Sequence, residues 1–454
     1  MLNDFLKASN AIAFDKKHRQ TLRFNIAQYE NKFAAMQSQF TDVEKARHIA
    51  KNLKWDAIEQ LDRYLLDFER NFKQRGGQVL WAVDAEEACK FVQQIAAYYN
   101  VERVVKSKSM VTEEINLNSA LERSGITVLE TDLGEYIAQL NGEAPYHVTA
   151  PILQKSKEDV AKTLHKTLGT PLQATPQEMT NAVRVHHRYE YLEADMGITG
   201  ANFLLADTGS VVVTENEGNA RLCTAFPRIH VAIAGIEKVL PSAKQLQLFL
   251  PLLATHSTGQ RISVYNTLYN GPRLPSEIDG PEAMFVILLD NGRSKLLADT
   301  KAREALYCIR CGACQNMCPV YRTVGGHTFG NTYAGPIGAA IAPHLEGMKQ
   351  QGHLADASSL CGRCNEVCPV AIDLHGVILH NRQQVTDENL RPAAETQFWK
   401  YWQDAMLRRW LMNLAPAPIK DWGFNRFFAE SWGKSHEMPE FPKQTFSELW
   451  KQNH

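Results

Sequence analysis

The chain has 454 residues, of which 44% are hydrophobic and 22% are charged, and its formal net charge is −1. This composition is typical of a soluble globular protein of two or three domains, and the charge gives no reason to bind nucleic acid or an anionic membrane surface. The N-terminus has no apolar core or cleavage site of a signal peptide. The apolar run from Leu246 to Ala254 is far shorter than the roughly 20 residues that cross a bilayer. We therefore expect a cytoplasmic protein with no transmembrane segment.

Residues 1–75 are predicted to form a helical N-terminal region. They contain no proline, and apolar residues recur at helical spacing between Val43 and Phe72. Gly76 and Gly77 are expected to end this region.

Residues 76–300 alternate between short β-branched runs and helical segments, which predicts an α/β domain with a largely parallel sheet. Two segments between the strands are predicted to be helical, Glu86–Tyr99 and Val111–Ser124. The predicted strands are Gln78–Val83, Arg103–Val105, Ile126–Glu130, His147–Leu153, Phe203–Ala206, Val211–Thr214, His230–Ala234 and Met284–Asp290.

Residues 301–385 are rich in Cys, Gly and Pro and are predicted to form a helical iron–sulfur domain.

Residues 386–454 form a Trp-rich tail that prolines divide into short segments. Because Trp is enriched at protein interfaces, we predict that the tail docks a partner. Packing against the iron–sulfur domain and peripheral contact with a membrane are the alternatives.

Seven of the nine cysteines fall between Cys308 and Cys368. In a reducing compartment such a cluster indicates metal ligation rather than disulfides. The other two, Cys89 and Cys223, have apolar neighbours and are predicted to be buried structural thiols. The first dense run matches the C-x₂-C-x₂-C-x₃-C-P pattern of bacterial ferredoxins; its cysteines are Cys308, Cys311, Cys314 and Cys318.

A second run, with Cys361, Cys364 and Cys368, aligns with the first but has Ser358 at the place of the first cysteine. In the ferredoxin pattern the fourth cysteine of each run ligates the other cluster. This exchange predicts a four-iron cluster on Cys308, Cys311, Cys314 and Cys368. The second cluster then has Cys318, Cys361 and Cys364, and its open corner takes water or hydroxide, takes Ser358 as a substitute ligand, or is lost to leave three irons.

Polar loops at the ends of strands give the α/β domain a candidate small-molecule site, because ligands bind at the carboxyl ends of parallel strands. There is no dinucleotide-binding or P-loop fingerprint. The residues that we single out are Lys106, Lys108, Asp132, Glu215, Asn216 and Glu217. Turn geometry alone is the alternative explanation for these loops.

Several segments together resemble one family. KSKSMVTEEINLN, ETDLGEYIAQL, GITGANFLLADTGSVVVTENEGNARLC and IAGIEK are similar to the lactate-utilisation domain. With CIRCGACQNMCPVYR, YAGPIGA and SSLCGRCNEVCPVAIDL after them, residues 50–385 resemble the lactate utilisation protein B family. The resemblance implies a domain similar to the phosphosugar-isomerase and CoA-transferase fold, followed by a helical double-cluster ferredoxin domain.

The resemblance also implies two partners, a CCG-domain iron–sulfur subunit and a small subunit with its own lactate-utilisation domain. The assembly resembles an L-lactate dehydrogenase that makes pyruvate without NAD. Because iron–sulfur clusters exchange single electrons, we expect this chain to be an electron-transfer subunit rather than the catalytic one. The alternative is a self-contained oxidoreductase or a small-anion or nucleotide-binding enzyme that uses the α/β loops.

Overall fold

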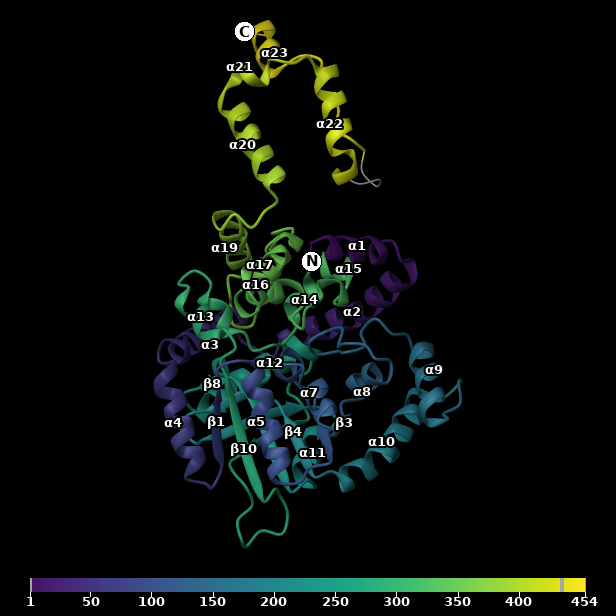
Figure 1. Ribbon diagram of the computed structural model, residues 1–454, viewed down its shortest axis with the longest axis vertical. Helices are drawn as coiled ribbons and strands as arrows, with labels where there is room; N and C mark the ends of the chain where they lie inside the picture. The colour runs from purple at the N-terminus through teal and green to yellow at the C-terminus, as the bar shows by residue number, and fades with distance from the viewer. Residues whose placement is uncertain (1, 433–436, 454) are drawn as a thin grey trace. The chain divides into compact units, whose positions relative to one another are not determined.

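A computed structural model describes residues 2–432 and 437–453 (Figure 1). The chain forms two compact units, residues 1–385 and residues 386–454. The larger unit contains an α/β domain, a helical N-terminal segment and a helical cysteine-rich region.

The centre of the larger unit is a parallel sheet of six strands in the order β1-β10-β7-β4-β2-β3. This confirms the predicted α/β class with a largely parallel sheet. The strands are β1 (Gln78–Ala82), β2 (Arg103–Lys106), β3 (Thr127–Glu130), β4 (Met196–Thr199), β7 (Ile229–Gly235) and β10 (Ala283–Leu289).

Alternating side chains of the central strands bury both faces of the sheet. On β10, Phe285, Ile287 and Leu289 pack on one face, where α5 (Ala85–Tyr98) and α7 (Leu117–Arg123) contribute Val92 and Leu121. The intervening residues of β10 face a second core with α12 (Leu246–Thr258). Because both faces are covered, β10 reads as a continuous apolar run.

The order of the strands places a switch point between β2 and β4. From β2 the chain passes through α6 (Met110–Glu114) and α7 to β3, which pairs on one side of β2. From β4, which pairs on the other side, the chain continues to β7 in the opposite direction across the sheet. Loops that leave such a point diverge and leave a crevice at the carboxyl ends of the strands.

A second sheet, with the order β8-β5-β6-β9, lies within the same unit and was not predicted. Its strands are β5 (Phe203–Leu205), β6 (Ser210–Glu215), β8 (Val239–Leu240) and β9 (Tyr265–Tyr269). Three strands, β4, β8 and β9, have no counterpart among the predicted ones.

The predicted helix Val111–Ser124 is broken into α6 and α7 at Asn116, which has a φ of +51°.

The predicted strand His147–Leu153 is wrong, because this segment forms turns. The His147 ring nitrogen Nδ1 accepts hydrogen bonds from the backbone N–H groups of Thr149 (3.1 Å) and Ala150 (3.2 Å). The Val148 N–H donates to the Gln315 side chain at 3.3 Å. These local bonds use backbone groups that a ladder would need, and they bring the turn against the cysteine-rich region.

Helices also make up the N-terminal segment of the chain. This segment comprises α1 (Leu2–Ala13), α2 (Lys16–Gln37), α3 (Val43–Glu59) and α4 (Leu61–Lys73). The first two helices contact the cysteine-rich region, and α4 packs on β1 and β8. Arg47 of α3 is buried and donates to the backbone carbonyls of Cys368 (2.7 Å) and Asn365 (2.6 Å).

Short helices make up the cysteine-rich region. They are α13 (Arg293–Ala298), α14 (Ala313–Met317), α15 (Tyr321–Val324), α16 (Gly335–Leu345), α17 (Met348–Gln351), α18 (Arg363–Glu366) and α19 (Leu374–Asp387). Connections in 3-10 form include Arg303–Tyr307 and Gly352–Ala357. Among helices α14, α16 and α18, α14 contacts both of the others, so the two cysteine runs lie side by side.

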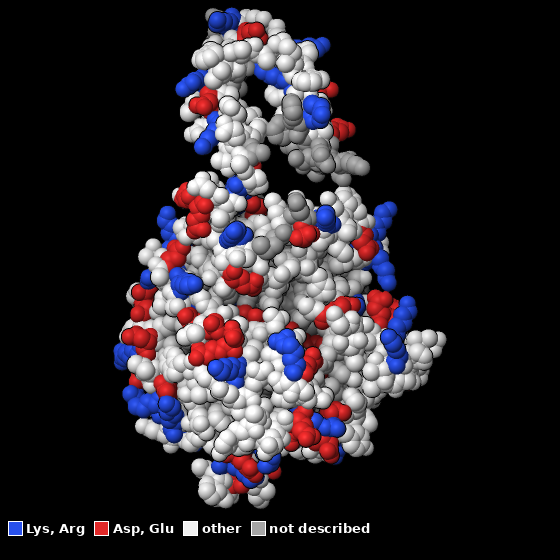
Figure 2. Space-filling view, viewed as in Figure 1, with Lys and Arg blue, Asp and Glu red and all other residues white. Residues whose placement is uncertain are grey.

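The smaller unit consists of α20 (Ala393–Leu407), α21 (Arg409–Met412), α22 (Ala417–Trp432) and α23 (Phe446–Asn453). Much of its surface in Figure 2 carries no charge. Several aromatic side chains are exposed on it: Trp399, Tyr401, Trp402, Trp410, Trp422 and Trp450. Across residues 2–432 and 437–453, none of the helices combines the length and the apolar character needed to cross a membrane.

His230 gives the fold a testable dependence on pH. It is fully buried on β7, Thr199 Oγ1 lies 2.8 Å from its Nε2, and burial lowers its pKa from 6.5 to about 3. The unfolded chain therefore binds the extra proton as the pH falls below 6.5, and stability is lost. By linkage this histidine costs about 2 kcal/mol at pH 5 relative to pH 7.5. Urea unfolding at both pH values measures this loss. We expect the free energy of unfolding of H230Q to fall by about 2 kcal/mol less than that of the wild type between pH 7.5 and pH 5. The H48Q variant, changed at an exposed site, should show the same fall as the wild type.

Candidate functional site

The seven clustered cysteines fall into two neighbouring groups. Cys308, Cys311, Cys314 and Cys368 line one small cavity, so the last cysteine of the second run lies with the first three of the first run. Burial raises the pKa of Cys311, and the thiols of Cys308 and Cys368 raise it further. Burial likewise raises the pKa of Cys364 to about 12, with Cys318 and Cys361 as its next contributors. The spacing predicts this grouping of thiols, and the ligand set of each cluster stays a prediction.

The two runs repeat the same backbone conformation. Arg310 and Leu360 occupy equivalent places with φ values of +61° and +53°, and Gly312 and Gly362 follow at +77° and +80°. The Arg310 N–H donates to Cys308 Sγ at 3.4 Å. The Leu360 N–H donates to Ser358 Oγ at 3.2 Å. Ser358 Oγ therefore has the same relation to its run as the Cys308 sulfur has to the first.

The donor set suits iron–sulfur clusters. One group offers four thiols around a single cavity, and backbone N–H groups point at sulfur, as from Ile372 to Cys368 and from Tyr321 to Cys318, both at 3.5 Å. Such N–H···S bonds tune cluster potentials. Of the seven cysteines Cys361 is exposed and Cys308 is half-buried, whereas the other five are buried.

A polar cavity of about 270 Å³ lies at the carboxyl ends of the parallel strands, and we call it the strand-end cavity. Its walls come from the loops after β2 (Ser107–Ser109) and β4 (Gly200–Asn202), from the end of β6 and from the segment after β7. It therefore occupies the crevice at the switch point. Gly200 keeps the two loops together, since a Cβ there would lie 2.6 Å from Ser109 Oγ.

Five of the six residues predicted for a small-molecule site line this cavity: Lys108, Asp132, Glu215, Asn216 and Glu217. Lys106 does not line it. Its Nζ is buried against Glu130 (2.8 Å) and Glu113 (3.1 Å), and these carboxylates raise its pKa against the opposing effect of burial. Lys106 thus supports the end of β2 from beneath the loop.

The acidic groups of the cavity are engaged by the backbone. The Glu215 carboxylate accepts from the N–H groups of Ala220 (2.7 Å) and Arg221 (3.0 Å), and Asp132 caps α8 (Leu133–Leu140). Glu217 accepts from the Leu133 N–H at 3.2 Å. Burial, with a contribution from Asp132, raises the Glu217 pKa to about 7.

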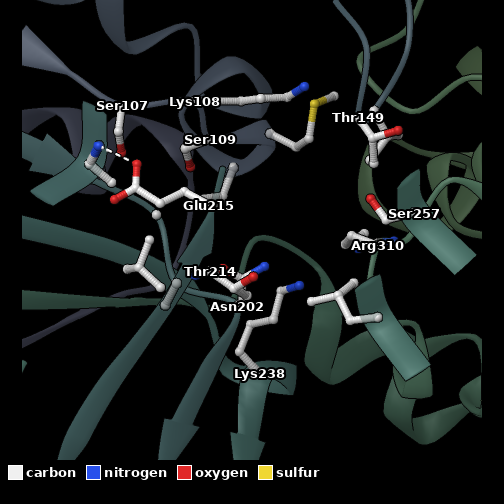
Figure 3. A pocket seen from close by; sticks show the side chains of 18 of the residues that line it. Ser107, Lys108, Ser109, Thr149, Asn202, Thr214, Glu215, Lys238, Ser257 and Arg310 are labelled. Atoms are coloured by element: carbon white, nitrogen blue, oxygen red, sulfur yellow. Dashed lines mark hydrogen bonds between the residues drawn. The ribbon is translucent and has the colours of Figure 1, made fainter. Parts of the chain in front are cut away.

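Three cationic residues that the sequence did not single out also line the cavity: Lys238, Arg293 and Arg310. Figure 3 shows that Lys108, Lys238 and Arg310 reach the cavity from different sides. Burial lowers the pKa of Lys238 to about 8. Arg310 sits between Cys308 and Cys311, and it lines both this cavity and the one around the first cysteine group. The position of Arg310 inside the cysteine run was the one feature of the sequence that could have pointed to this residue.

A buried ion network joins the cavity to the cysteine-rich region. Arg293 is 2% exposed; it donates to Glu237 at 2.6 Å and to both carboxylate oxygens of Glu114 at 2.8 Å. The Tyr333 hydroxyl donates to Glu114 at 2.6 Å, and Arg310 stacks over the Tyr333 ring at 4.4 Å. Although burial alone would raise it, Arg293 and Arg310 hold the pKa of Glu237 at about 2.

Comparison with known proteins agrees with this architecture. Residues 65–289 match the LUD domain and residues 304–372 match the 4Fe-4S dicluster domain. The fold and the cysteine groups thus define an iron–sulfur protein built on a LUD domain.

Relatives extend the similarity over most of the chain. Lactate utilization protein B of Bacillus cytotoxicus is 40% identical over 421 residues, 90% of this chain and 89% of that protein. The Bacillus licheniformis protein of the same name is 44% identical and covers 78% of this chain and 74% of its own length. An uncharacterized electron transport protein of Escherichia coli K12, YkgF, is 39% identical, with coverages of 90% and 88%. The chain belongs to the lactate utilization protein B family.

The ion network predicts a large effect of removing Arg293. R293M leaves the carboxylates of Glu114 and Glu237 buried without their shared cation, so we expect the free energy of unfolding to fall by about 3–5 kcal/mol. Urea unfolding of the cluster-loaded chain measures this. The matched control is R70M, which breaks an exposed pair with Asp67 and should cost less than about 1 kcal/mol. Equal effects of the two changes would contradict the role of the network.

Proposed function

We propose that this chain is the iron–sulfur electron-transfer subunit of a cytoplasmic, NAD-independent complex that oxidises L-lactate to pyruvate. The observation that carries the proposal is the pair of adjacent cysteine groups, one buried beside the strand-end cavity and one reaching the surface at Cys361. A bound iron–sulfur cluster accepts and releases one electron at a time. The names of the relatives support lactate as the electron source.

The partners in this proposal are a CCG-domain iron–sulfur subunit and a small subunit with a lactate-utilisation domain. The exposed aromatic side chains of residues 386–454 offer a surface for docking one of them. Cys361, the exposed cysteine of the second run, offers a place for electrons to leave or enter. The LUD domain then positions the first cluster, through the contacts of Glu237 with Arg310 and of Glu114 with Tyr333, rather than carrying out the dehydrogenation.

The electron path can be tested by removing a thiol. Because Cys311 belongs to the buried four-thiol group, C311S in the assembled complex should abolish the EPR signal that L-lactate induces in the wild type. C89S is the control: Cys89 is buried in α5, away from both groups, and should leave the signal intact. Full lactate-dependent reduction in C311S would refute the relay.

For the second cluster we propose Ser358 as the fourth ligand, beside Cys318, Cys361 and Cys364. The support is the repeated backbone geometry, which gives Ser358 Oγ the place of the Cys308 sulfur. Water or hydroxide at this corner, or a three-iron cluster, remain the alternatives from the sequence.

This ligand assignment predicts a difference between two adjacent serines. Loss of the Ser358 oxygen in S358A should convert the second cluster to a three-iron form, seen as a new EPR signal in the oxidised protein. S358C should retain the four-iron form, and S359A, at an exposed neighbour, should match the wild type. A wild-type spectrum in S358A would exclude Ser358 as a ligand.

A second candidate function is a self-contained oxidoreductase, which the cavity beside the first cysteine group favours. Turnover of L-lactate by the purified chain alone, with an artificial electron acceptor, would support it. Complete dependence on partner subunits would exclude it.

A further inference from the structure

We infer that the strand-end cavity is a binding site for a small carboxylate anion of the 2-hydroxy or 2-oxo acid class. The electron-transfer role proposed above does not require this chain to bind such a molecule. The choice of a carboxylate over other anions rests on that proposed function, whereas the anion site itself rests on the residues of the cavity.

Unpartnered donors are the first reason. Lys108 Nζ, Arg310 Nη1 and Ser107 Oγ are shielded from solvent, yet they make no hydrogen bond with the described part of the chain. Ser107 is 2% exposed. Buried donors of this kind are costly unless a ligand satisfies them. All three belong to residues that line the same cavity.

The engagement of the charged groups is the second reason. Lys108, Lys238 and Arg310 converge on the cavity (Figure 3). The four carboxylates of the lining already have partners in the chain: Asp132, Glu215 and Glu217 accept backbone N–H groups, and Glu237 pairs with Arg293. An anion is therefore the ligand that would satisfy the remaining cationic donors. Arg310 Nη2 faces Glu237 at 3.5 Å, whereas Nη1 stays available to donate to a bound carboxylate.

The size of the cavity and the polar groups beside its cations narrow the class of ligand. About 270 Å³ is close to the lower limit of small-molecule sites, which suits an acid of few atoms better than a nucleotide. Asn202, Thr214 and Ser257 line the cavity beside the cations and offer hydrogen-bonding groups for a hydroxyl or keto oxygen. Because Arg310 also lines the cavity around the first cysteine group, the bound acid would lie next to that cluster.

Calorimetry on the anaerobically reconstituted full chain, without partners, tests the site with L-lactate, pyruvate and inorganic phosphate as separate titrants. We expect saturable binding of lactate or pyruvate at one site per chain. K108M and K238M should each weaken it by about 10- to 100-fold, since each removes a charged hydrogen-bond donor. K244M, at an exposed lysine outside the cavity, should bind like the wild type.

Variants are compared only where their cluster absorption and urea midpoint match the wild type. Should K238M fail this condition, K238R keeps the charge and should bind within a few-fold of the wild type, and K108M then carries the loss-of-charge test. Three outcomes would overturn the assignment: no binding of lactate or pyruvate, an affinity of K108M for them equal to that of the wild type, or binding of phosphate alone. A chain that binds the acid but passes no electrons in the complex refutes the relay and retains the site.

Discussion

The arrangement of the larger unit depends on three charged side chains that are buried together where the α/β domain meets the cysteine-rich region. Arg293 follows β10, Glu114 ends α6, and Glu237 follows β7, so the network forms only when the parallel sheet has its native order. Arg310 and Tyr333 extend it into the cysteine-rich region. A buried charge without a partner is strongly destabilising. The network therefore fixes the first cysteine run against the LUD domain and also builds one wall of the strand-end cavity.

The ion network also fixes the order in which the sites of the larger unit follow one another from its interior to its surface. The strand-end cavity lies at the switch point of the sheet, Arg310 separates it from the four-thiol group, and the second run reaches the surface at Cys361. A route for electrons from interior to surface follows from that order. The same order explains why residues of the LUD domain and of the iron–sulfur region share one cavity lining, although they are far apart in sequence.

The sequence was informative where chemistry is local. Alternation of apolar runs predicted the α/β class, and cysteine spacing predicted ligand sets in which Cys368 joins the first three cysteines, with which it shares a cavity lining. It was less informative for residues that act through tertiary contacts. Lys238 and Arg310 reach the cavity only because β7 and the first cysteine run meet there, and Lys106 is diverted by buried carboxylates. The segment 147–153 has the composition of a strand, but the His147 ring captures its backbone N–H groups.

The N-terminal helices also bear on how the two cysteine runs meet. Cys368 of the second run lines one cavity with Cys308, Cys311 and Cys314, which requires residues 361–368 to fold against residues 308–318. Arg47 of α3 contributes to this by holding the carbonyls of Cys368 and Asn365 from a distance of more than 300 residues in sequence. The N-terminal helices therefore hold in place the segment that brings Cys368 to the first three cysteines of the first run.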